Sequence, residues 1–506
     1  MNLHEPVSFR ETSFRETRLA AEPRADTGLA LASLLNRRAF FVTGAGSSAS
    51  APTELPTGPQ LAERLVAWAE DSGLSERMTA LEDRYDLGQV CEALNGALGR
   101  GMVVREIGEA VDWEGSDPNL CHLAIAILFG EEAVSISFTV NWDPKLGDAF
   151  ERVAGNSKPW VAHNAATMSM ASNNDPRLIH LHGLWPDAAS LVMTSTELEE
   201  NAAVKWTDPQ LRTSLSSGGA ILVGFAAEPT YVLKSLSEMR ELMDSPPTSV
   251  IGREEVDTFT AKSPGLTEAI RLNEDLDRYV QGDACEVLGE LLRCYYRKRV
   301  ETVIDAAAEK ARAAQGLGAK FSMLGRQRLE EALGDLSLED LLGLLWSSTA
   351  RVSEEAACRQ RTIAAATPGL QEILACVMVL ACAEGVRDLS ASRFGFRLET
   401  EGRGPVELWP VIPENQLSPS DARVRAFQHS DLFGGPADAE VPLVLVCGDT
   451  VGAIPKGGKV SLVGEGRPES VGSGRRSPID TINLFLLDER LVGHEGPIAI
   501  EEALAL

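Results

Sequence analysis

The sequence predicts an α/β protein built on a buried parallel sheet, followed by a helical module and a small C-terminal domain that contains β-strands. Before residue 297, short apolar runs alternate with longer segments of helical periodicity. Apolar strands without polar alternation, separated by helices, are typical of a parallel sheet that is covered on both faces. The chain has 506 residues, of which 44% are hydrophobic and 24% charged, enough for about two to four globular domains.

Four apolar runs and one further short run are predicted to be the strands of this sheet. The first of them follows a leucine-rich helical segment that begins at Leu29. The runs are Ala39–Thr43, Ala133–Val140, Leu178–Leu181, Ala220–Val223 and Asp277–Val280. Helices are predicted between them, including one over Leu87–Val111 and one over Leu120–Phe129. A last helix over Cys285–Arg293 is expected to close this domain.

Changes in composition divide the rest of the chain. Residues 1–30 are expected to be an N-terminal arm, disordered or docked on a neighbouring subunit, in which the pentapeptide SFRET occurs twice in tandem. Within the domain at 31–297, a segment rich in Pro, Ser and Thr at about 245–270 is expected to be an insertion. Helical periodicity predicts a separate helical module over 298–395. Residues 396–506 are expected to form an α+β or β-rich domain, with strands over Val441–Val446, Lys459–Val463 and Ile482–Leu487.

The charge and cysteine content restrict the partners and the compartment. A formal net charge of −27 disfavours direct binding of nucleic acid and of anionic membranes. The longest apolar stretch, Ile373–Ala383, has the length of a core helix and is too short to span a bilayer. The eight cysteines include no C-x-x-C pair, which indicates a reducing compartment without a cysteine-rich zinc site. We therefore expect a cytoplasmic protein with no membrane segment and no metal.

Glycines and polar residues cluster where four of the predicted strands end. The turn after the first strand, GAGSS, has the form of a phosphate-binding loop. In an open α/β sheet, ligands bind at the carboxyl ends of the strands, so these residues are expected to form one site. They are Gly44, Ala45, Gly46 and Ser48 after the first strand, Thr139, Asn141 and Asp143 after the second, His182 and Gly183 after the third, and Gly224 after the fourth.

The order of these motifs resembles that of the sirtuin family over residues 33–297, including Gly282, Asp283 and Ala284 after the last strand. The resemblance implies a sirtuin-type, Rossmann-like domain that binds NAD⁺, with the glycine turn around the phosphates. It further implies that Asn141 and Asp143 hold the nicotinamide ribose and carboxamide, and that His182 is the base facing the ribose hydroxyls. Gly224 would border the ribose and phosphates, residues 282–284 would lie near the adenine, and Thr57 joins the expected cofactor-binding residues.

The chain departs from sirtuin deacylases in two places. It lacks the paired cysteines of the zinc module that shapes their acyl-lysine groove, and Leu55-Pro56-Thr57-Gly58 replaces their Pro-Asp-Phe-Arg loop. No role is therefore assigned to the missing Asp and Arg. These departures look like the divergent sirtuin-like domains of bacterial antiphage proteins, which hydrolyse NAD⁺ to nicotinamide and ADP-ribose. The resemblance thus implies an NAD⁺ glycohydrolase that acts as the effector of an abortive-infection system, with NAD⁺ as substrate.

Two other functional classes stay open on the sequence. One is a noncatalytic module that binds NAD or ADP-ribose as a sensor or scaffold, and the other is a protein deacylase or ADP-ribosyltransferase. A homo-oligomer, or a sensor or regulatory protein subunit, is expected as partner, since a helical module offers the surface for assembly.

The histidines are expected to have different roles. His182 at its ordinary pKa of about 6.5 could take a proton at cellular pH. His180 is expected to point to the same side of the strand as His182, because side-chain directions repeat every two residues along a strand, and its expected role is to pack. His122 and His163 lie outside the motifs and are expected to be structural or exposed.

Overall fold

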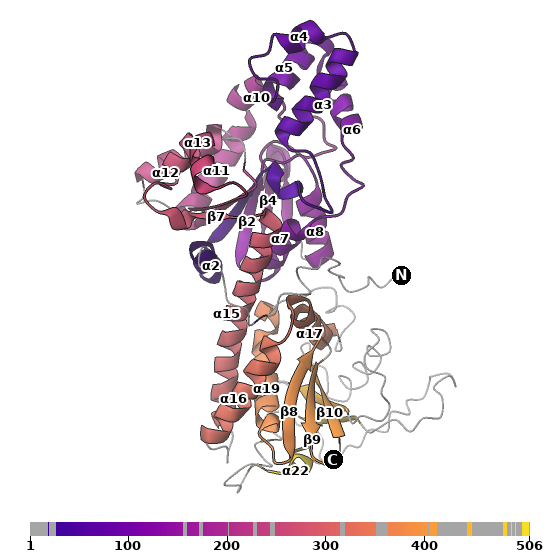
Figure 1. Cartoon of the computed structure of the whole chain (residues 1–506), viewed down its shortest axis with the longest axis vertical. Coiled ribbons are helices and arrows are strands. Elements are labelled where there is room, and N and C mark those ends of the chain that lie inside the picture. The colour runs from indigo at the N-terminus through magenta and orange to yellow at the C-terminus, as the bar shows by residue number, and fades with distance from the viewer. Residues whose placement is uncertain are drawn as a thin grey trace, which may run out of the picture. The chain divides into compact units, whose positions relative to one another are not determined.

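The chain folds into two compact units, each with its own sheet (Figure 1). One unit lies within Pro23–Tyr295, and the other combines residue 19 with residues from 296 onward. The structure is a computed structural model. It describes residues 19, 27–154, 159–171, 176–200, 202–225, 230–242, 248–313, 319–350, 363–393, 395–402, 404–411, 443–447, 479–482, 487, 491 and 498–504.

The first unit is organised by a sheet of seven parallel strands in the order β3-β4-β2-β1-β5-β6-β7. The strands are β1 (Ala39–Thr43), β2 (Val134–Thr139), β3 (Trp160–Ala162), β4 (Arg177–His180), β5 (Gly219–Val223), β6 (Thr248–Gly252) and β7 (Tyr279–Gln281). All five residues of the central strand β1 are buried, as their apolar character predicts. The predicted fold class is confirmed.

Helices connect these strands. They are α2 (Gly28–Leu35), η2 (Ala45–Ser48), α3 (Gly58–Asp71), α4 (Ser75–Thr79), α5 (Leu87–Leu98), α6 (Arg100–Ala110), α7 (Leu120–Gly130), α8 (Lys145–Ala154), α9 (Ala165–Ser169), α10 (Ser195–Glu200), α11 (Ala202–Ser217), α12 (Thr230–Leu242), α13 (Val256–Lys262), α14 (Pro264–Ala269), η4 (Leu276–Arg278) and α15 (Ala284–Ala313). The helix predicted over 87–111 is two helices, because Gly99 adopts a φ of 82° between them. Helices α3 to α6 share a separate apolar core and are grouped together in Figure 1.

The insertion expected at about 245–270 is part of the sheet. Strand β6 lies there, paired with β5 on one side and β7 on the other, and α13 and α14 follow it. The sequence signal was weak because β6 begins with Thr248 and Ser249, which are nevertheless 1% and 3% exposed. Backbone pairing with β5 and β7 holds this strand inside the sheet although two of its side chains carry hydroxyl groups.

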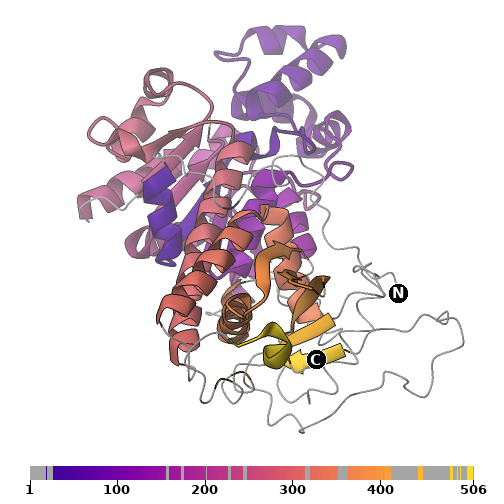
Figure 2. The same ribbon diagram turned by 60° about the horizontal axis from the view of Figure 1, so that its bottom comes forward.

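The helices and strands of the second unit pack together, whereas the sequence predicted a separate helical module over 298–395. Its elements after α15 are α16 (Ala319–Gly334), α17 (Leu338–Ala350), α19 (Ile363–Ala381), β8 (Val386–Ser392), β9 (Gly395–Thr400), β10 (Gly404–Val411), β11 (Leu443–Cys447), β12 (Ile479–Ile482) and α22 (Ile500–Leu504). The strands form one sheet in the order β12-β11-β10-β9-β8. Helices α16 and α19 pack against it (Figure 1, Figure 2).

Other expectations differ in their bounds. Strand β8 falls inside the range expected to be helical, and β12 precedes the strand predicted over 482–487. The helix predicted over 285–293 continues to Ala313. The strand predicted over 459–463 and most of the N-terminal arm lie outside the described residues. Among the described helices, none is long and apolar enough to cross a membrane.

Candidate functional site

The glycine turn after β1 packs directly against the turn after β5. The N–H of Gly44 donates to the Val223 carbonyl at 2.8 Å, and the N–H of Gly46 donates to the Gly224 carbonyl at 3.0 Å. A Cβ on Gly46 would lie 2.8 Å from the Gly224 Cα, and Gly224 itself has a φ of +67°. Glycine is required at position 46 because a side chain there has no space, and at position 224 because the backbone has a positive φ. The turn then continues into η2, which holds Ser47 and Ser48 buried.

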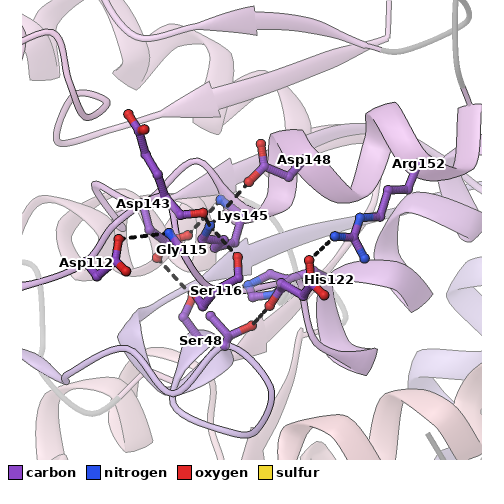
Figure 3. Close-up of polar contacts among 12 residues, drawn as sticks. Ser48, Asp112, Gly115, Ser116, His122, Asp143, Lys145, Asp148 and Arg152 are labelled. Atoms are coloured by element: carbon purple, nitrogen blue, oxygen red, sulfur yellow. Dashed lines mark hydrogen bonds and ion pairs between the residues drawn. The ribbon is translucent and has the colours of Figure 1, made fainter. Parts of the chain in front are cut away.

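Ser48 is the centre of a buried hydrogen-bond network (Figure 3). Its hydroxyl donates to Asp143 Oδ2 at 2.9 Å, and Asn141 Nδ2 donates to it at 3.1 Å. His122 Nε2 lies 3.1 Å from the same oxygen. His122 Nδ1 accepts from the Asn119 N–H at 3.2 Å, so the ring proton resides on Nε2 and is donated to Ser48. The hydroxyl thus connects three side chains from α7 and from the end of β2.

Asp143 is buried at 5% exposure next to a buried lysine. Burial raises the pKa of Asp143, although hydrogen bonds from Ser48 and the Lys145 N–H and the charge of Lys145 oppose the shift. The Lys145 side chain is fully buried, and Nζ donates to the Ser116 carbonyl at 2.6 Å and to the Glu114 carbonyl at 3.3 Å. Lys145 therefore fixes the loop before α7 against the start of α8, as Figure 3 shows.

Asn141 is held by its backbone and by the nitrogen end of its side-chain amide. Its N–H donates to Thr139 Oγ1 at 3.1 Å, and its carbonyl lies 3.1 Å from His180 Nδ1. Its Nδ2 donates to Ser47 Oγ at 3.3 Å as well as to Ser48. Asn141 Oδ1 is buried without a hydrogen-bond partner in the described part of the chain. Such an acceptor is costly unless a ligand or water supplies a donor.

His182 and Gly183 follow β4, beside the end of β2. Burial lowers the pKa of His182 to about 4, against the effect of a hydrogen bond with the Val140 backbone. The imidazole is therefore neutral near pH 7, with a lower pKa than the ordinary value expected from the sequence. Gly183 has a φ of +84°, and a Cβ there would lie 2.2 Å from the Ser190 carbonyl oxygen. This conformation turns the chain directly after the histidine.

His180 and His122 are more deeply buried than His182, with 1% exposure each. Burial lowers the pKa of His180 to about 4, and burial together with the charge of Lys145 lowers the pKa of His122 to about 3. His180 packs in the strand as predicted and bonds Asn141, but its Nε2 has no partner among the described residues. His122 is structural, as predicted, but it also belongs to the Ser48 network.

The ends of β6 and β7 form a second polar group. Asp283 Oδ2 accepts from Ser50 Oγ at 3.0 Å and from Arg253 Nε at 2.9 Å, and Arg253 Nη2 donates to Ser50 Oγ at 2.6 Å. Burial raises the pKa of Asp283, but hydrogen bonds from the Cys285 N–H, Ser50 and Arg253 outweigh it, so the pKa is lowered. Ser50 follows the glycine turn, so Arg253 places a positive charge beside that loop. Gly282 and Ala284 flank this aspartate.

The structure thus brings most of the predicted residues to one sheet edge. Thr57 differs, since it caps α3 and its N–H and hydroxyl both donate to Gln60 Oε1. Sequence reasoning missed Asn119, Lys145 and Arg253, and gave His122 no part in the site. A signal for His122 existed, because Asn119 and His122 form a capping box at the start of α7.

Three tryptophan side chains, Trp113, Trp142 and Trp185, lie together next to this edge. Trp142 stands between Asn141 and Asp143 in the chain, and Trp113 stacks on Trp185 with ring centroids 5.8 Å apart. Trp113 also lies 6.5 Å from Trp142. Within the described ranges, no group of three or more His, Cys, Asp and Glu side chains is arranged to hold a metal ion.

Residues 135–269 match the family model of the SIR2-like domain. The match includes Asn141, Asp143, His182 and Gly224, and it confirms the predicted resemblance to sirtuins. A comparison with curated proteins finds no match.

The chain is also similar to solved Sir2 structures. A structure on the mechanism and regulation of Sir2 enzymes has 13% identity and a TM-score of 0.32, covering 55% of this chain and 100% of that one. A Sir2 homologue in complex with NAD has 16% identity and a TM-score of 0.33, covering 55% and 96%. A Sir2 homologue variant with 2′-O-acetyl ADP-ribose has 17% identity and a TM-score of 0.31, covering 53% and 96%.

Proposed function

Because the chain contains a SIR2-like domain at residues 135–269, we propose that it is an NAD⁺ hydrolase that releases nicotinamide and ADP-ribose. The observation that carries this proposal is the buried, unpartnered Oδ1 of Asn141 at the carboxyl edge of the sheet. The rest of the side chain is fixed by Ser47 and Ser48, so the free acceptor has a set position. A positioned acceptor of this kind can orient a ribose hydroxyl or a water.

The proposed placement of the substrate follows the sheet edge. The diphosphate would lie on the glycine turn at Gly44 to Ser48, and the nicotinamide riboside would lie toward Asn141 and Asp143. The adenosine would lie toward Gly282 and Asp283. The strand order reverses direction between β1 and β5, and the glycine turn after β1 lies at this point, which is the usual ligand position in such sheets.

The proposed reaction makes modest demands on these residues. The bond from ribose C1′ to the nicotinamide nitrogen breaks, and its electron pair goes to the ring, which leaves as neutral nicotinamide. The oxygen of a water bonds to the cationic C1′, and His182 accepts the proton that the water releases. His182 is neutral near pH 7 and can accept this proton, although its lowered pKa makes it a weaker base than an ordinary imidazole. Ser48 and Lys145 keep Asp143 in place to accept from the carboxamide.

We further propose that this activity serves as the effector of an antiphage abortive-infection response, controlled by assembly or by a regulatory protein. The support is the resemblance of the zinc-less motif set to such effectors. Phage challenge of cells that carry the chain, with NAD⁺ measured over the infection, tests it. Unchanged NAD⁺ together with unchanged plaque numbers would contradict this role while leaving the hydrolase proposal intact.

The test of the hydrolase is to incubate the purified chain with NAD⁺ and to follow nicotinamide and ADP-ribose by chromatography. Asn141→Ala and His182→Ala are each expected to lower turnover at least about 100-fold. Asn36→Ala is the matched control, since Asn36 is an exposed asparagine of the same unit that bonds only within its own helix end.

The possible outcomes separate the functional classes. Full activity in both site variants would overturn the site assignment. NAD⁺ binding by calorimetry without turnover would indicate a noncatalytic binding module. Product that forms only with an acylated peptide, as acyl-ADP-ribose, would indicate a deacylase.

A further inference from the structure

Three polar side chains next to Asn141 have no part in the proposed reaction so far. His180 ends β4, and its Nδ1 lies 3.1 Å from the Asn141 carbonyl oxygen. His163 follows β3, and its Nε2 lies 3.2 Å from Asp187 Oδ2. We infer that Asp187, His163 and His180 form a hydrogen-bonded relay, closed by one water between the two imidazoles, that positions Asn141. The inference rests on the proposed hydrolase function, because Asn141 is the residue that the relay holds for the reaction.

The strand register brings the two histidines together. Ala162 of β3 pairs with Ile179 of β4, so His163 and His180 occupy the next pair of positions. Paired positions on neighbouring strands lie about 4.8 Å apart and share one face of the sheet. Burial lowers the pKa of His180, and a charge on His163 lowers it further, as expected for two rings that lie close together. The two imidazoles are therefore neighbours at the carboxyl edge of the sheet.

The hydrogen bonds of the two rings fix where their protons reside. The Asn141 carbonyl can only accept, so the proton of neutral His180 is on Nδ1 and Nε2 is an acceptor. Asp187 accepts from His163 Nε2, so a neutral His163 ring also presents an acceptor at Nδ1. His180 Nε2 and His163 Nδ1 are both buried, and neither has a hydrogen-bond partner in the described part of the chain. One water that donates a hydrogen to each ring satisfies both acceptors.

The outer end of the relay is fixed by backbone turns. The His163 N–H donates to Thr167 Oγ1 at 3.1 Å. The Asp187 N–H donates to the Leu184 carbonyl at 2.9 Å, and the Ser190 N–H donates to the Asp187 carbonyl at 2.9 Å. The His163–Asp187 pair therefore joins the loop after β4 to the end of β3.

The inner end of the relay acts on the backbone of Asn141. The Asn141 N–H donates to Thr139 Oγ1, and its carbonyl accepts from His180 Nδ1. With the backbone held on both sides, the side chain leaves it in one direction and the Oδ1 atom keeps its position. His180 is 1% exposed, so loss of its ring proton would leave the Asn141 carbonyl without this donor. His180 is thus a positioning residue that acts through Asn141.

Exchange of the His180 Nδ1 proton with solvent tests the relay without NAD⁺. NMR of the full chain with isotope-labelled histidine follows this proton, and its signal is assigned by its loss in His180→Gln. His163→Leu and Asp187→Ala are each expected to speed the exchange at least about threefold, because the His180 ring loses its support. Asp257→Ala is the matched control, since Asp257 is an exposed aspartate of α13 in the same unit.

Initial rates of NAD⁺ hydrolysis test the positioning role. His180→Leu is expected to lower kcat at least about 20-fold and to change the KM by less than about twofold, because Asn141 is misplaced for reaction. His180→Gln is expected to keep kcat within about threefold of the original chain, because its amide can still donate to the Asn141 carbonyl. His163→Leu alone is expected to lower kcat about fivefold, and adding it to His180→Leu is expected to have no further effect, because both act through one contact.

The two measurements separate this inference from the proposed function. Absence of turnover in the original chain would contradict the hydrolase, and proton exchange would still decide whether the relay exists. Equal exchange rates in the original chain, His163→Leu and Asp187→Ala would overturn the relay. The positioning role would be overturned by full turnover in His180→Leu, by a His180→Gln variant as slow as His180→Leu, or by a double variant in which the two losses multiply.

Discussion

Lowering the pH from 7.5 to 5.0 is expected to destabilise the first unit by about 2 kcal/mol through each of two buried histidines, His122 and His180. Their pKa values are about 3 and about 4 in the folded chain, against 6.5 as the ordinary value. Between these limits the unfolded chain binds a proton at each histidine and the folded chain does not. The unfolded state therefore holds more protons, and stability falls as the pH falls. At pH 5.0 the difference in proton binding between the unfolded and folded states lowers the free energy of unfolding by about 2 kcal/mol for each histidine.

The expected loss through His122 and His180 must be separated from the effects of His182, whose lowered pKa acts in the same direction, and of Asp143. Burial raises the pKa of this carboxyl, so the folded state binds its proton at a higher pH than the unfolded state, and stability is gained as the pH falls. His180→Gln isolates one histidine, because the glutamine amide can still donate toward the Asn141 carbonyl. This variant is expected to lose about 2 kcal/mol less than the original chain over the same pH interval.

Urea unfolding at pH 7.5, 6.5, 5.5 and 5.0 measures these differences by tryptophan fluorescence. Six of the eight tryptophans lie between residues 68 and 206, so the signal reports mainly on the first unit. The reasoning would be refuted if the original chain and His180→Gln lost the same free energy of unfolding between pH 7.5 and 5.0. It would also be refuted by a stability that rises as the pH falls through this window in both proteins.

Three substitutions test other parts of the site. Gly46→Ala is expected to lower the free energy of unfolding by about 2 kcal/mol or more, because its Cβ would lie 2.8 Å from the Gly224 Cα. Gly58→Ala is the control, since open space surrounds this position, and it should change the free energy of unfolding by no more than about 0.5 kcal/mol. Thermal unfolding of the two variants measures the difference. Arg253→Ala is expected to raise the KM for NAD⁺ about tenfold with little change in kcat, because it removes the cation beside the loop that follows the glycine turn, and initial rates decide this. Lys145→Met should lower the free energy of unfolding by about 1–3 kcal/mol in urea, because it removes the charged donor that bonds two carbonyls of the loop before α7, and an unchanged value would show that water replaces the ammonium group.

The parts of the site that could be predicted are those read from adjacent residues at strand ends. The glycine turn and the Asn-x-Asp motif each occupy a few consecutive positions after a buried strand. The parallel register then brings these residues together, because Thr43 at the end of β1 pairs with Thr139 on β2 and with Val223 on β5. Once three neighbouring strands end at the same level, the residues that follow them must meet.

The parts that could not be predicted depend on burial and on tertiary contacts. His122 lies on a helix whose other residues are almost all apolar, 74 positions from Ser48, so only the folded chain brings the two together. The pKa of His182 was expected at its ordinary value, and burial lowers it to about 4. Strand β6 was not predicted because its hydroxyl residues mask the apolar pattern of a buried strand, although a parallel strand paired on both sides tolerates such residues.

The charged groups along the sheet edge are paired within the protein at both ends. At the β2 end Asp143 lies next to the buried Lys145, and His122 and His182 are neutral near pH 7. At the other end the guanidinium of Arg253 is bonded to Asp283 as well as to Ser50. The proposed orientation of NAD⁺ therefore rests on hydrogen-bonding groups and not on net charge. The Oδ1 of Asn141, which has no partner among the described residues, lies at the β2 end, where the nicotinamide riboside is proposed to bind, and a ribose hydroxyl there would supply the missing donor.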